Sequence, residues 1–98
     1  MITQATVQTP YGEFYLTRLC RHFAHKVPAT VVETQGLIEF PFGPCRIEVD
    51  TEQMHFSIKV HEDHEVVLAE KVVKEHLLRM ANRDQPLVEW HRTPEPNI

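Results

Sequence analysis

The chain has 98 residues, a length that fits one domain with one hydrophobic core. Hydrophobic residues make up 42% of it and charged residues 24%, which excludes a fibrous or intrinsically disordered protein. The formal net charge of −4 lacks the basic excess typical of nucleic-acid-binding proteins, so we expect no nucleic acid as a partner.

No segment predicts secretion or membrane insertion. Polar residues such as Thr3, Gln4 and Thr6 interrupt the stretch after Met1, unlike a secretory signal. No apolar run approaches the roughly 18–20 residues that span a bilayer. We therefore expect a cytoplasmic protein with no membrane partner and with its cysteines reduced.

A strand and a helix are expected first. Alternating apolar and polar residues over 2–9 predict the strand. Thr9 and Pro10 are typical of a helix start, with Thr9 as N-cap and Pro10 at the first helical position. The helix should reach about His25, because Pro28 disfavours helical geometry at the residue before it.

Four alternating segments follow and predict half-buried antiparallel strands with one wet face. Turns are expected at Gln35-Gly36 and at Gly43-Pro44, and Pro41 indicates an edge strand or a bulge. The four segments are residues 29–34, 37–42, 45–50 and 54–60.

Apolar residues at helical spacing predict a second helix over residues 63–82, and residues 86–90 suit a last short strand. The predicted fold class is α+β, an antiparallel sheet with two helices on one face. Its element order is β-α-β-β-β-β-α plus a C-terminal β. We expect one domain over residues 1–92 and a flexible tail over 93–98.

At about 100° per residue, the first helix divides into two opposite faces. The expected core face contains Leu16, Leu19, Cys20, Phe23 and Val27. The opposite face contains Arg18, Arg21, His22, His25 and Lys26, together with the aromatic Tyr11 and Phe14. Cys20 and His22 therefore point apart, and a regular helix excludes a shared metal ion.

Three interpretations of His22 and His25 remain open. They can be part of a solvated basic face, contact an anionic ligand or a partner, or supply two metal ligands. The second interpretation is favoured by their neighbours Tyr11, Phe14 and Arg18, because surface aromatics beside cations are unusual unless something covers them.

Three further side chains complete the candidate set. His76 lies in the apolar stripe of the second helix, where it is either a hydrogen-bonded core residue or a ligand contact. Arg83 lies one turn further along and either ends the helix or forms an anion-binding corner with Trp90. Cys20 and Cys45 are expected to be buried hydrophobic residues instead of nucleophiles.

The strings "LCRHFAHK", "IEFPFGPCRIE" and "EHLLRMANRDQPLVEW" occur in the order of a known pattern. Together they resemble a bacterial domain family of uncharacterised function that is found alone or attached to siderophore-interacting flavoproteins. The resemblance implies a link to iron handling, and Met80 stands where the pattern has an aromatic residue. The marked positions are Cys20, His22, Phe23, His25, Lys26, Gly43, Cys45, His76, Arg79, Arg83 and Trp90.

We therefore expect a small binding or accessory domain whose partner is an anionic small molecule, such as an iron chelate, or another protein. Two alternatives are a metal site built on His22 and His25 and a homodimer that covers Tyr11 and Phe14. A cysteine-dependent enzyme is a weaker alternative, since no base accompanies Cys20. The ligand-binding candidates are Arg18, His22, His25, Lys26, His76, Arg83 and Trp90.

Overall fold

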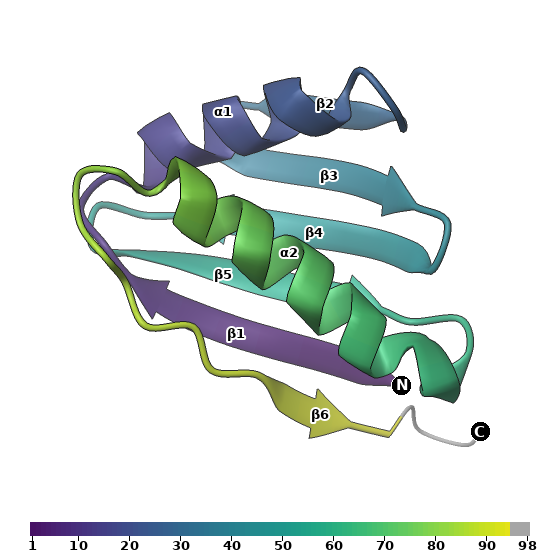
Figure 1. The fold of residues 1–98 in the computed structure, drawn as a ribbon. Helices are drawn as coiled ribbons and strands as arrows, with labels where there is room; N and C mark the ends of the chain where they lie inside the picture. The colour runs from purple at the N-terminus through teal and green to yellow at the C-terminus, as the bar shows by residue number, and fades with distance from the viewer. Residues whose placement is uncertain (95–98) are drawn as a thin grey trace.

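Six strands form one antiparallel sheet in the computed structural model, which describes residues 1–94 (Figure 1). Across the sheet they lie in the order β2-β3-β4-β5-β1-β6, and every neighbouring pair is antiparallel. The α+β prediction and its element order are confirmed. The strands are β1 (Ile2–Gln8), β2 (Ala29–Val32), β3 (Gln35–Phe40), β4 (Gly43–Val49), β5 (Gln53–Lys59) and β6 (His91–Thr93).

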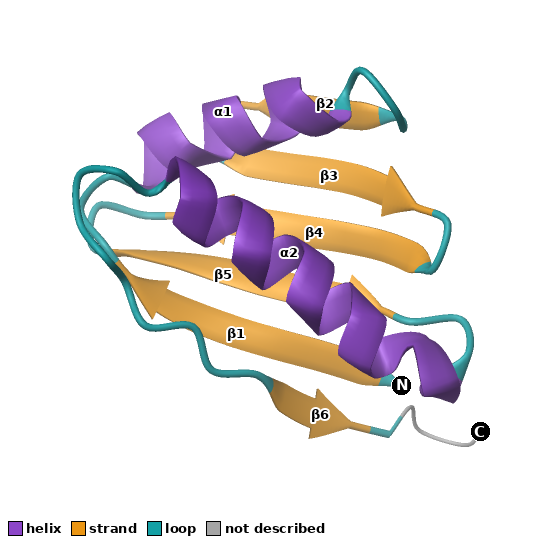
Figure 2. Cartoon of the chain, in the orientation of Figure 1, coloured by secondary structure: helices purple, strands orange, loops and turns teal. Residues whose placement is uncertain are grey.

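Two helices cover one face of this sheet (Figure 2). α1 (Gly12–Phe23) lies over β2, β3 and β4, and α2 (Val66–Met80) follows the short 3-10 turn η1 (Asp63–Glu65). Buried residues alternate with more exposed ones along β1, β3, β4 and β5, because only this face is covered, whereas the edge strands β2 and β6 contain no buried residue. The core therefore lies between the helices and the sheet. Within residues 1–94, neither helix is long and apolar enough to cross a membrane.

The predicted first helix is two residues too long at each end. It begins at Gly12 because the hydroxyl of Thr9 accepts a hydrogen bond from the Tyr11 amide, which forms a turn before the helix. It ends at Phe23, whose carbonyl accepts hydrogen bonds from the amides of both Lys26 and Val27.

The turn between β2 and β3 lies at Glu33 and Thr34, so the predicted Gln35-Gly36 turn is wrong. Glu33 adopts the left-handed backbone that the turn requires, with φ of 55°. Gly36 instead lies inside β3, where the absence of a side chain lets α1 approach. A Cβ at this position would lie 2.7 Å from Cδ1 of Leu16.

The predicted Gly43-Pro44 turn is also wrong, because both residues belong to β4 and the turn lies at Pro41 and Phe42. Gly43 has φ of +140°, and a Cβ there would lie 2.0 Å from the carbonyl oxygen of Lys59. Glycine is therefore required where β4 begins beside β5, for steric reasons and not as a turn residue.

The predicted end of α2 and the predicted position of the last strand also differ from the structure. α2 with η1 covers Asp63–Met80, two residues short of the predicted end. Residues 86–90 are not a strand; the last strand is β6, whose Thr93 pairs with Ile2. The predicted tail 93–98 therefore starts inside β6, and its residues 95–98 lie outside the described part of the chain.

A buried carboxylate connects α2 to the strands at the β6 edge. Glu70 is 8% exposed, accepts a 2.7 Å hydrogen bond from the hydroxyl of Thr3, and forms a two-contact ion pair with Arg92. The Arg92 guanidinium, followed by the Thr3 hydroxyl, holds the pKa of Glu70 below its ordinary value. These contacts fix α2 against β1, which carries Thr3, and against β6, which carries Arg92.

We expect Glu70→Gln to lower the free energy of unfolding at pH 7 by roughly 1–3 kcal/mol, since Arg92 and Thr3 lose their charged acceptor. A lowered folded-state pKa stabilises the fold above the ordinary glutamate pKa of about 4.3, and this contribution is lost as the pH falls through the lower value. Denaturant unfolding from pH 3 to 8 checks this expectation. A variant deficit that persists unchanged in acid would contradict it.

Candidate functional site

α1 and α2 lie side by side and run in opposite directions across the sheet (Figure 1). Phe23, near the end of α1, packs its ring 4.8 Å from the ring of His76 in α2, and the neighbouring His22 ring lies 5.3 Å from the His76 ring. The core face of α1 is buried as predicted, with Leu16, Leu19, Cys20 and Phe23 inside and Val27 half-buried.

The outer sides of the two helices form a cleft of about 420 Å³ that we call the basic cleft. Its α1 residues recur one and two turns apart, so that they share one stripe of the helix surface, and His25 follows in the turn after α1. α2 contributes Met80 from its last turn. The lining residues are Phe14, Arg18, Arg21, His22, His25 and Met80.

Arginines of this chain cover the aromatic end of the basic cleft. Tyr11 is 38% and Phe14 is 37% exposed, as the helix pattern predicted. The guanidinium carbon of Arg83 lies 4.5 Å from the centre of the Phe14 ring and 5.7 Å from that of Tyr11. Arg18 lies 5.3 Å from the Phe14 ring. Phe14 therefore holds two cations beside the cleft through cation–π contacts.

Buried Tyr15 positions the loop that carries Arg83. Its hydroxyl donates a 2.5 Å hydrogen bond to Oδ1 of Asp84 and accepts hydrogen bonds from the amides of Arg83 and Asp84. Burial, and then the bond to Asp84, raise the pKa of Tyr15. The sequence reasoning missed this residue, because its partner is 69 residues away and no local pattern marks it.

His76 has a fixed hydrogen-bonding state. Its Nδ1 lies 2.7 Å from the carbonyl oxygen of Val72, and a carbonyl only accepts, so Nδ1 carries a proton and Nε2 lies outside this hydrogen bond. Partial desolvation, followed by the positive charges of His76 and Lys26, lowers the pKa of His22. We therefore expect His22 to be neutral at pH 7.

The site concentrates positive charge on a molecule that is negative as a whole. Five of the ten lysines and arginines line the basic cleft, contact Phe14 or act electrostatically on His22. Both helices place cations in their last turn, where the helix dipole favours them. The five are Arg18, Arg21, Lys26, Arg79 and Arg83.

The structure does not bring Trp90 to this group. Trp90 packs edge-on against Phe56 and lines a separate hollow with residues of α2 such as Lys71 and Leu78. Its Nε1 is buried and has no hydrogen-bond partner among the described residues. Arg83 contacts Tyr11 and Phe14, so the expected Arg83–Trp90 corner is replaced by an arginine–aromatic cluster on α1.

His22 and His25 both line the basic cleft, and His22 is in addition in ring contact with His76. In residues 1–94 no group of three or more histidine, cysteine or acidic side chains is placed to hold a metal ion.

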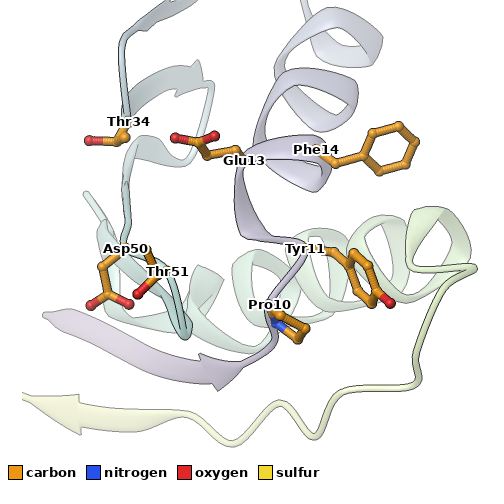
Figure 3. Close-up of a pocket in the computed structure, with 7 residues that line it drawn as sticks. All are labelled: Pro10, Tyr11, Glu13, Phe14, Thr34, Asp50 and Thr51. Atoms are coloured by element: carbon orange, nitrogen blue, oxygen red, sulfur yellow. The ribbon is translucent and has the colours of Figure 1, made fainter.

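A second cleft, of about 560 Å³, lies at the N-terminal end of α1 (Figure 3). Glu13 and Asp50 make it acidic, and the rings of Tyr11 and Phe14 point away from those carboxylates. Asp50 accepts two backbone hydrogen bonds, from the amides of Glu52 and Gln53, and these bonds lower its pKa. Asp50 therefore stabilises the turn between β4 and β5. Phe14 therefore lies between an acidic cleft and the basic cleft.

Both cysteines are free and buried, as the sequence predicted. Burial raises the pKa of Cys20 to about 11 and raises that of Cys45 as well. A thiol of this kind is protonated at neutral pH and is a poor nucleophile.

We expect iodoacetamide to leave both thiols of the folded protein unmodified at pH 8 and to alkylate both after denaturation. Mass spectrometry of native and denatured samples checks this. Modification of Cys20 in the native protein with an inflection near or below the free-thiol pKa of about 8.5 would contradict the assignment.

Comparison with known proteins identifies a family and a solved structure to which this chain is similar. A family model described as "Uncharacterized protein conserved in bacteria (DUF2218)" matches residues 4–91. The solved NMR structure of PA4090 from Pseudomonas aeruginosa has the same fold, with a TM-score of 0.75 and 24% sequence identity over 92% of this chain and 94% of that one. The comparison with curated proteins finds no match.

Proposed function

The chain belongs to the DUF2218 family of uncharacterised bacterial proteins, and we propose that it is a binding or accessory domain that holds an anionic ligand in the basic cleft. The observation that carries this proposal is the gathering of five cations and two histidines along two adjacent helices of a chain whose net charge is −4. Such a local field attracts anions even though the protein as a whole repels them.

The donors of the cleft suit carboxylate or phenolate oxygens. Arg18 and Arg21 present planar guanidinium groups that bind two oxygens at once, and His25 adds a ring nitrogen. The guanidinium groups of Arg18 and Arg83 lie against the Phe14 ring, and a flat ligand ring can stack on such a guanidinium plane. An anionic ligand with aromatic rings matches all three features.

A ferric chelate with catecholate groups is the ligand that we propose. It combines a net negative charge with flat rings, and the resemblance of the "LCRHFAHK" pattern to domains attached to siderophore-interacting flavoproteins supports an iron link. A homodimer through Tyr11 and Phe14 is the alternative. It is less favoured because Arg18 and Arg83 already lie against the Phe14 ring and reduce the apolar area left for a second copy.

Calorimetric titration with a ferric tris-catecholate tests the proposal. We expect Arg18→Gln combined with Arg21→Gln to weaken binding by about tenfold, which corresponds to about 1.4 kcal/mol, and added salt to weaken wild-type binding. Arg46→Gln is the matched control, because Arg46 is an exposed arginine on the open face of the sheet.

A neutral ferric hydroxamate is the control ligand and should bind much more weakly. Absence of tris-catecholate binding to the wild-type protein would overturn the iron-chelate assignment. Binding that Arg46→Gln weakens as much as the Arg18/Arg21 variant would overturn the assignment to the basic cleft.

A further inference from the structure

His22 and His76 form a pair of imidazoles that the anion-binding role does not require. Their ring centres are 5.3 Å apart and their planes are inclined by 43°. Two imidazoles that share one metal ion through bonds of about 2.0–2.1 Å have ring centres roughly 4.5–5.3 Å apart, for bond angles between square and tetrahedral. The observed separation of 5.3 Å lies at the tetrahedral end of this range.

The hydrogen bonding of the pair also suits coordination. Because the carbonyl of Val72 holds a proton on Nδ1 of His76, Nε2 is the nitrogen of this ring whose lone pair can bind a metal when the ring is neutral. A backbone carbonyl that orients an imidazole in this way is the usual outer partner of a metal-binding histidine. Within residues 1–94, neither nitrogen of His22 is in a hydrogen bond.

The position of the two rings is held by packing. Phe23 lies 4.8 Å from the His76 ring and 5.1 Å from the His22 ring, both as ring-to-ring contacts. Phe23 itself packs on Phe40 of β3, so the pair is supported by the core. A pre-positioned pair loses little conformational entropy when it binds an ion.

The charge around the pair opposes a bare cation. Lys26 and Arg79 place positive charge on His22, and Arg18 and Arg21 line the adjoining cleft. The described part of the chain also offers no third ligand of the histidine, cysteine or carboxylate type. A metal ion bound here must therefore bring its own negative charge and its remaining ligands.

We propose that His22 and His76 coordinate the metal ion of an anionic chelate that has open coordination positions, while the arginines of the basic cleft neutralise the chelator. In this exchange each imidazole nitrogen donates a lone pair to the metal and displaces one bound water. No electron is transferred, and no proton is released from neutral rings. The inference rests on the proposed anion-binding function and narrows its ligand class to anionic metal chelates with open coordination positions, such as a ferric bis-catecholate. A ferric tris-catecholate, whose positions are filled, would be held by the arginines of the basic cleft alone.

Two copper chelates distinguish metal coordination by the histidine pair from anion binding by the basic cleft. Cu²⁺–nitrilotriacetate is a negatively charged complex with open positions, whereas Cu²⁺–EDTA is a negatively charged complex whose positions are filled by the chelator. Copper is chosen because it has the highest affinity for nitrogen donors among the common divalent ions. Both are titrated into the full chain carrying His61→Ala and His64→Ala, which removes a second histidine pair before the start of α2 that could also bind copper.

In this background we expect Cu²⁺–nitrilotriacetate to bind at least about tenfold more tightly than Cu²⁺–EDTA. Its electron paramagnetic resonance spectrum should show two coupled imidazole nitrogens. His22→Ala should reduce the count to one nitrogen without opening the core, since His22 is exposed, and His76→Gln should do the same. His25→Ala, in a cleft residue outside the pair, should keep both nitrogens.

Equal affinity for the two chelates, or a signal of two imidazole nitrogens that persists in both His22→Ala and His76→Gln, would overturn metal coordination by this pair and leave anion binding intact. Loss of a nitrogen in His25→Ala with none lost in His76→Gln would overturn the assignment to this pair. Failure of both chelates to bind would contradict anion binding by the cleft as well.

Discussion

The side-by-side packing of α1 and α2 on one face of the sheet is the constraint on which the candidate site depends. α1 can lie close to β3 because Gly36 has no side chain, and α2 is held from its other side by Glu70. The ring of Phe23 in α1 packs against that of His76 in α2. Tyr15 in α1 donates a hydrogen bond to Asp84 in the loop after α2. Every side chain of the basic cleft takes its place from this pair of helices.

The positive charge of the candidate site also results from the packing of the two helices. Each helix ends in a cationic turn, which is favourable for that helix alone because of its dipole. When the two helices are brought together, cations that are separate in sequence share one surface. Desolvation, followed by these positive charges, lowers the pKa of His22. Cations gathered on one surface repel one another, and an anionic ligand would relieve this repulsion.

Local pattern predicted much of the fold, for identifiable reasons. The strands have one buried and one exposed face, so alternation marks them, and the helical stripe of Leu16, Leu19 and Phe23 is buried as expected. Turn positions were less predictable. Gly36 and Gly43 are glycines because of close contacts across the sheet and with α1, and such contacts are not visible in local sequence.

The candidate site was predicted only on its α1 side. Helical spacing placed Arg18, His22 and His25 together on one face, and they line one cleft. The contributions of α2 and of the following loop depend on tertiary contacts. His76 meets His22, while Arg83 is directed to Phe14 by the hydrogen bonds that Tyr15 makes with its loop.

Side-chain NMR during titration with citrate, a small diamagnetic polyanion, tests the central claim most directly, because it reports where an anion binds without assuming its identity. The account predicts shifts of the ring resonances of His22 and His25 and of the Arg18 guanidinium. The histidines at the far end of α2, His61 and His64, should stay unchanged. Shifts centred on His61 and His64, or spread evenly over all histidines, would contradict a specific anion site between the helices.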